Sequence, residues 1–139
     1  MIPLAVPNLT GRESEYLQEC IETTFVSSVG PFVTRFEKMV AEATGGSMAA
    51  ATSAGTTGLH AALVAVGVGR NDLVVLPSFT FIASANAIEY CGASPWLLDV
   101  TVDSWTLDPI LLGEQLATET NQRNDRLILK ATGRRVAAV

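Results

Sequence analysis

Residues 73–76, with the sequence LVVL, form a continuous run of aliphatic side chains that ends at Pro77. A strand that is apolar on both faces needs cover on both faces, and parallel strands between helical layers have this cover. A second apolar run follows over residues 94–100, and the residues between the two runs, 80–91, predict a helix that Gly92 ends. Strand, helix and strand in this order predict a right-handed βαβ unit. The expected fold class is therefore α/β, with a mostly parallel sheet flanked by helices.

Before this unit, the chain predicts further helices and one more strand. Thr10 and Glu13 match the capping-box pattern T-x-x-E at the start of one helix. A second helix is expected to stop at Gly45, because glycine commonly ends helices. A short strand is predicted near residues 48–52, and a helix near residues 56–66.

After the βαβ unit, the pair Asp108 and Pro109 predicts the start of another helix, with the aspartate as its cap. Residues 118–126 are polar and typical of a loop. Residues 126–130 and 135–139 are expected to form strands around a turn.

The length of 139 residues is enough for one modest domain. We interpret residues 1–47 as N-terminal helices and residues 48–139 as the start of the α/β sheet. The composition is 48% hydrophobic and the mean hydropathy is +0.32, which is apolar for a small protein with a proportionally large surface. We therefore expect either a partner that covers much of this surface or a larger protein of which the chain is a piece.

Charge and segment lengths limit the partners. The net charge of −5 argues against nucleic-acid binding. No apolar run approaches the roughly 18 residues of a membrane span, and the opening MIPLAVPNLT lacks the basic region of a signal peptide. Cys20 and Cys91 have no metal-ligand spacing and indicate a reducing compartment. We expect a cytoplasmic protein without a metal site.

The stretch ATSAGTTGLH, residues 51–60, joins a predicted strand to a predicted helix. At such a corner the first helical N–H groups lack intrahelical partners and lie at the positive end of the helix dipole. Gly55 and Gly58 allow a ligand close to the backbone, and Thr56 and Thr57 add hydroxyl groups, which suits a phosphate or carboxylate. In the alternative interpretation, Ser53 only caps the helix and the glycines only permit tight packing. The local sequence leaves both open.

Several stretches together resemble a known family. Successive blocks of the DegT/StrS-type sugar aminotransferases are resembled by FVSSVGPFVTRFE at 25–37, ATSAGTTGLHAAL at 51–63, VVLPSFTFIASANAI at 74–88, GASP at 92–95 and TLDP at 106–109. These are fold-type I enzymes that depend on pyridoxal phosphate. The resemblance is strongest to members that act on nucleotide-linked 4-keto-6-deoxy sugars. It implies that the chain is part of the large domain of an aspartate-aminotransferase-like fold.

The resemblance also implies a cofactor, pyridoxal 5'-phosphate, and residues that hold it. The matching loop cradles the cofactor phosphate and the matching aromatic side chain stacks on the pyridine ring, whereas another matching segment borders the sugar-nucleotide pocket. In this sequence the cofactor residues are Ala54, Gly55, Thr56, Thr57 and Phe81, and the substrate residues are Ser27, Ser28, Val29 and Gly30. For Phe81 the alternative is a core side chain, and for residues 27–30 it is a plain helix-breaking turn.

The chemistry of the family needs two groups that have no counterpart in this sequence. One is the lysine that forms a Schiff base with the cofactor, and the other is the carboxylate beside the pyridinium nitrogen. Neither Lys38 nor Lys130 matches the catalytic position. We therefore expect the N-terminal portion of the cofactor-binding domain, without the small C-terminal domain and inactive by itself.

The parent enzyme is expected to be a homodimer that moves an amino group, with glutamate as the expected donor, to a keto-sugar nucleotide in bacterial surface-sugar biosynthesis. Two alternatives stay open. One is a related dehydratase with histidine in place of the lysine, and the other is a non-catalytic fragment or binding module that keeps the phosphate cradle. A Rossmann dehydrogenase is disfavoured because Gly67 and Gly69 follow a helix and lack the third glycine of that motif.

Overall fold

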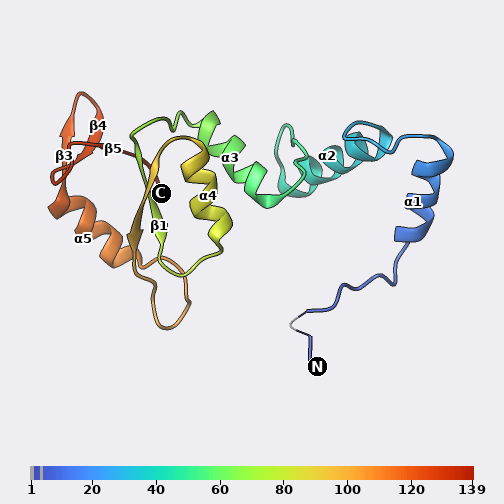
Figure 1. The fold of residues 1–139 in the computed structure, drawn as a ribbon, viewed down its shortest axis with the longest axis horizontal. Helices are drawn as coiled ribbons and strands as arrows, with labels where there is room; N and C mark the ends of the chain where they lie inside the picture. Colours follow the sequence, from blue (N-terminus) through green and yellow to red (C-terminus); the bar gives the residue numbers. More distant parts are fainter. Residues whose placement is uncertain (1, 4) are drawn as a thin grey trace. The chain divides into compact units, whose positions relative to one another are not determined.

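The computed structural model of the chain describes residues 2–3 and 5–139. The chain divides into two compact units, Met1–Ala51 and Thr52–Val139. Figure 1 shows the succession of helices in the first unit and the sheet with its helices in the second.

The first unit contains two helices, α1 (Glu13–Glu22) and α2 (Pro31–Thr44). Proline in the first turn of α2 suits a position whose N–H has no intrahelical partner. Gly45 ends α2 with a φ of 71°, a left-handed conformation that favours glycine, and the predicted stop is confirmed.

The predicted capping box at the start of α1 is wrong. The helix begins at Glu13 after Arg12, and no side chain caps it. The Thr10 hydroxyl instead donates a hydrogen bond of 2.8 Å to Asn8 Oδ1, so this threonine is engaged in the preceding turn. Serine and threonine side chains compete in this way between caps and local turns.

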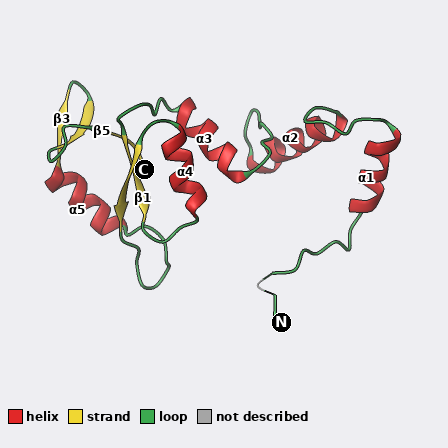
Figure 2. Ribbon diagram, in the orientation of Figure 1, coloured by secondary structure: helices red, strands yellow, loops and turns green. Residues whose placement is uncertain are grey.

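The second unit is a sheet with helices. The strands follow the order β2-β1-β5-β4-β3, and β1 is parallel to both of its neighbours. An antiparallel hairpin, β3 and β4, completes the sheet beyond β5. In Figure 2, α3 and α4 lie on one side of β1 and α5 lies on the other. The elements are α3 (Gly55–Ala65), β1 (Leu73–Pro77), α4 (Ile82–Tyr90), β2 (Ser94–Leu98), α5 (Pro109–Glu119), β3 (Thr120–Arg123), β4 (Arg126–Leu129) and β5 (Arg135–Ala138).

This arrangement confirms the α/β class and the unit of β1, α4 and β2. Asp108 caps α5 as predicted: its Oδ1 accepts hydrogen bonds from the N–H groups of Ile110 (2.8 Å) and Leu111 (3.1 Å). The strands predicted near 126–130 and 135–139 are also confirmed as β4 and β5.

Two other predicted elements are wrong. Residues 48–52 form no strand, and the part of the chain that the structure describes offers them no strand partner. Residues 118–126 are not a loop, because β3 occupies 120–123 and pairs with β4. In both cases strand formation depends on a pairing partner and not on the local hydrophobic pattern.

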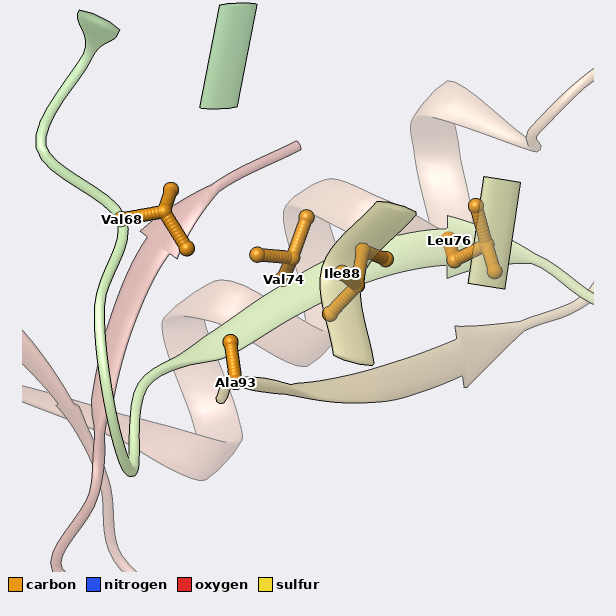
Figure 3. Close-up of a cluster of buried hydrophobic side chains, with 5 residues drawn as sticks. All are labelled: Val68, Val74, Leu76, Ile88 and Ala93. Atoms are coloured by element: carbon orange, nitrogen blue, oxygen red, sulfur yellow. The ribbon is translucent and has the colours of Figure 1, made fainter. Parts of the chain in front are cut away.

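The core lies between β1 and α4. Residues 73–76 of β1 are all buried, which confirms that this strand is covered on both faces. Figure 3 shows the central cluster, in which Ile88 of α4 is 2% exposed. Its members are Val68, Val74, Leu76, Ile88 and Ala93.

Two consecutive arginines join the start of β1 to β5. The guanidinium of Arg135 forms an ion pair with both carboxylate oxygens of Asp72, and its Nε lies 2.9 Å from Asp72 Oδ1. The guanidinium of Arg134 donates to the carbonyl oxygens of Asn71 (2.7 Å) and Asp72 (2.8 Å) and to the Ser94 hydroxyl (3.0 Å). These contacts attach β5, and with it the hairpin of β3 and β4, to one end of β1. This end lies opposite the carboxyl ends of β1 and β2.

Candidate functional site

The carboxyl ends of β1 and β2 meet at one edge of the sheet, where ligands bind in open α/β folds. Helix α4 begins just beyond this edge. Helix α3 ends before the chain turns into the start of β1, so its N-terminus is directed toward the same edge. Leu59, in the second turn of α3, lines a hollow together with Pro77 at the end of β1. The two predicted cofactor segments, residues 54–57 and Phe81, therefore belong to the same side of the second unit.

The start of α3 offers backbone donors. Ala54 has an extended conformation (φ −161°, ψ 161°), and its carbonyl oxygen accepts the first intrahelical hydrogen bond, from Gly58 N–H at 3.1 Å. The N–H groups of Gly55, Thr56 and Thr57 precede this bond and so have no partner in the helix. They lie at the positive end of the helix dipole, where an anion is stabilised.

The Thr57 side chain shapes this corner. Its hydroxyl donates to the carbonyl oxygen of Ala54 at 2.7 Å and accepts from the Ala54 N–H at 3.1 Å. Ser53 does not cap the helix, because the capping position is Ala54; the Ser53 hydroxyl lies 3.4 Å from that of Thr57. Thr57 thus fixes the loop with its side chain, and its N–H has no partner within the helix.

The two glycines of the loop, Gly55 and Gly58, differ in the space around them. A Cβ at Gly58 would lie 3.1 Å from Thr52 Oγ1, so glycine here allows close packing that a side chain would push apart by a few tenths of an ångström. A Cβ at Gly55 would meet nothing within 4 Å. The space beside Gly55 is therefore open to a ligand. The packing interpretation holds for Gly58 only.

Phe81 precedes α4 as its N-cap residue and is 86% exposed, so it is not a core side chain. It lines a hollow of about 300 Å³ with Phe79 and Thr80. A neighbouring hollow of about 230 Å³ reaches the ends of both strands, at Pro77 and Leu97. An exposed ring beside two hollows presents a flat apolar face to a planar ligand.

Residues outside the predicted set fix the loop of residues 78–81. The Ser78 N–H donates to the Leu98 carbonyl oxygen at 2.7 Å, and the Ser78 hydroxyl donates to Asp99 Oδ1 at 3.2 Å. The rings of Phe79 and Trp105 pack at 5.2 Å between centroids. Sequence patterns gave no signal for these contacts, because their partners are about 20 residues or more apart in the chain.

The predicted substrate residues, 27–30, belong to the first unit and lie in the segment between α1 and α2. The Val29 N–H donates to the Ser27 hydroxyl at 3.3 Å, and Val29 is 67% exposed. Gly30 has a φ of 148°, and a Cβ there would lie 3.2 Å from the Phe25 ring. The segment is a turn that requires glycine at its end, and its role toward a substrate stays a prediction.

The described residues contain no cluster of three or more histidine, cysteine, aspartate or glutamate side chains that could bind a metal ion. Within those same residues, every helix is too short or too polar to span a bilayer. The Lys130 ammonium donates to the Thr118 carbonyl oxygen near the end of α5.

Taken together, the candidate site combines the backbone N–H donors at the start of α3, which suit an anion, with the exposed aromatic ring of Phe81.

Residues 7–131 match the model of the DegT/DnrJ/EryC1/StrS aminotransferase family. The chain is 46% identical over 119 residues to a GDP-perosamine synthase of Caulobacter vibrioides, covering 86% of this chain and 32% of that protein. It is 39% identical over 119 residues to a GDP-perosamine synthase of Escherichia coli O157:H7, covering 86% and 33%. The chain thus spans about a third of the length of the curated relatives that it matches.

A solved structure of the aminotransferase from Psychrobacter cryohalolentis is similar in fold. Its TM-score is 0.72 at 28% identity, and the match covers 81% of this chain and 29% of that one. This likeness confirms the fold class that the sequence resemblance implied.

Proposed function

Since the chain belongs to the DegT/DnrJ/EryC1/StrS aminotransferase family, we propose that it is the cofactor-binding part of a sugar aminotransferase that depends on pyridoxal phosphate. The substrate we infer is a nucleotide-linked keto sugar, because the relatives described above are GDP-perosamine synthases. The single observation that carries the proposal is the open start of α3 at Gly55, beside the strand edge that also carries Phe81.

The residues of this chain fit the cofactor as follows. The N–H groups of Gly55, Thr56 and Thr57 would hold the phosphate, and the Thr56 hydroxyl would add a donor. Phe81 would stack on the pyridine ring. When bound, pyridoxal phosphate supplies the electron sink that an exchange of amino and keto groups requires. The Schiff-base lysine and the carboxylate for the pyridinium nitrogen are proposed to come from another part of the full-length protein.

We propose a homodimer in the cytoplasm. The dimer is supported by the first unit, where a partner would cover the apolar faces of α1 and α2. Leu17, Ile21, Phe36 and Met39 are each more than half exposed in this unit. Exposed apolar surface of this kind marks interaction sites on soluble proteins. Light scattering of the full-length protein should give at least twice the monomer mass at micromolar concentration, and a monomer would contradict the proposed dimer.

The phosphate cradle is tested by titrating pyridoxal phosphate into the full-length protein and its Thr56→Ala variant. Loss of one hydrogen bond to a charged group costs about 1.5–3 kcal/mol, so we expect binding to weaken by about tenfold or more. Thr118→Ala is the matched control, because the Thr118 hydroxyl only bonds the Glu114 carbonyl oxygen within α5. Unchanged affinity of Thr56→Ala would remove this residue from the cradle.

The reaction is tested with glutamate and a keto-sugar nucleotide. Formation of an amino sugar with consumption of glutamate supports the aminotransferase. Loss of a sugar hydroxyl without amino transfer would indicate the related dehydratase instead. Cofactor binding without either reaction would indicate a non-catalytic binding module.

A further inference from the structure

Phe81 has little packing of its own to hold it, because 86% of its surface is exposed. The position of its ring therefore depends on the backbone of residues 78–81. This backbone is attached to a second loop, residues 99–108, which follows β2 and leads into α5. The two attachments are the Ser78–Asp99 hydrogen bond and the Phe79–Trp105 ring contact.

Asp99 is the polar attachment, and it is held from three directions. Its Oδ1 accepts hydrogen bonds from the Ser78 hydroxyl (3.2 Å) and from the Val100 N–H (2.8 Å). Its carbonyl oxygen accepts one from the Asp108 N–H at 3.2 Å. The carboxylate thus joins the end of β1 to a loop whose own ends are tied together.

The second loop, residues 99–108, is held in shape by hydrogen bonds within it. Thr101 and Thr106 pair through their backbones at 3.0 Å, and the Ser104 hydroxyl lies 2.6 Å from that of Thr101 and 2.7 Å from that of Thr106. Trp105 has a φ of 58°, which a non-glycine residue keeps only when the surrounding structure determines it. The loop therefore gives Asp99 and Trp105 fixed positions from which to hold residues 78–81.

We propose that Asp99 is a positioning residue that acts through Ser78 on the Phe81 backbone and so strengthens binding of the cofactor ring. This inference rests on the proposed function. A flexible loop loses conformational freedom when a ligand orders it, and that loss weakens binding. The Asp99–Ser78 hydrogen bond removes part of this freedom when the protein folds, together with the Ser78 N–H bond to the Leu98 carbonyl oxygen. The start of α3, which holds the phosphate, does not depend on Asp99.

The test compares Asp99→Ala with Asp103→Ala in the full-length apoprotein, because alanine removes the Oδ1 acceptor that an asparagine would keep. Asp103 is the matched control, because it is an exposed aspartate of the same loop and its change removes the same carboxylate. We expect Asp99→Ala to weaken pyridoxal phosphate binding about fivefold, the effect of one ordinary hydrogen bond. Asp103→Ala should leave this affinity unchanged. Both variants should bind inorganic phosphate like the wild type, measured by its competition with the cofactor.

A double-mutant cycle separates positioning from a general structural effect. In the Phe81→Ala background, Asp99→Ala should weaken cofactor binding by less than about twofold, since the ring that it positions is gone. Ser78→Ala removes the same hydrogen bond and should repeat the pattern if Asp99→Ala does not fold.

The inference is overturned if Asp99→Ala and Ser78→Ala leave cofactor affinity unchanged, or if their effect is equally large without Phe81. Equal weakening of phosphate and cofactor binding would also overturn it. If the wild-type protein does not bind pyridoxal phosphate at all, the proposed function fails first.

Discussion

The two units of the chain differ in what they bury. In the second unit, nine apolar side chains are buried, and most of them belong to β1 and α4. In the described part of the first unit no side chain is buried, although α2 carries an apolar stripe that includes Phe36 and Met39. An apolar stripe shows that one face of a helix must be buried against something. The second unit has a sheet that buries the apolar faces of its helices, and the described part of the first unit has none.

The largest expected contrast between the units comes from shortening one apolar side chain in each. Ile88→Ala should lower the free energy of unfolding by about 2–5 kcal/mol, because Ile88 is buried against β1 and leaves a cavity. Phe36→Ala should change it by about 0.5 kcal/mol or less in the 139-residue chain, because Phe36 is 59% exposed. Urea unfolding followed by circular dichroism measures both. An equal cost for Phe36→Ala would show that α2 has a core of its own.

A smaller contrast comes from one ion pair in each unit. In the second unit, Asp72→Asn should lower the free energy of unfolding by about 1–3 kcal/mol, because the Asp72 side chain is 12% exposed and bonded to Arg135. In the first unit, Lys38 and Glu42 are 3.8 Å apart and their side chains are 75% and 66% exposed. Glu42→Gln should therefore cost about 0.5 kcal/mol or less.

The Asp72 pair also gives the second unit a pH dependence. The hydrogen bond from Arg135 holds the pKa of Asp72 below its ordinary value of 3.8. A carboxylate with a lowered folded-state pKa contributes stability above its unfolded pKa, and this contribution is lost as the pH falls through the folded pKa. The advantage of wild type over Asp72→Asn should be full at neutral pH and decline below about pH 4. A constant difference from pH 7 to pH 2 would contradict this assignment.

The smallest expected contrast concerns helix caps. Asp108→Ala should lower the free energy of unfolding by about 1 kcal/mol, because Asp108 accepts two N–H hydrogen bonds at the start of α5. Thr10→Ala should have no measurable effect, because Thr10 does not cap α1. Thermal unfolding of the two variants measures both effects. A loss of stability in Thr10→Ala would show that Thr10 caps α1 after all.

Much of the second unit could be predicted from local patterns. The apolar run of residues 73–76, the Asp108 cap and the helix that stops before Gly92 all depend on neighbours within a few residues, so the chain encodes them locally. The start of α3 was also predictable as a loop with free N–H groups. The assignment of Ala54, Gly55, Thr56, Thr57 and Phe81 to a cofactor came from the resemblance to a family, and it stays a prediction.

The sequence by itself determined the α/β class, the main helices and the location of the candidate anion site, because hydrophobic period, capping and helix dipoles act over one or two turns. Only the tertiary structure decided that β5 lies between β1 and β4, that residues 120–123 form a strand and that residues 48–52 do not. It also decided the Asp72–Arg135 pair, across 63 positions, and the Asp99–Ser78 bond that holds the Phe81 loop. Such contacts need a partner from a distant part of the chain, and no local pattern identifies which partner the fold will bring there.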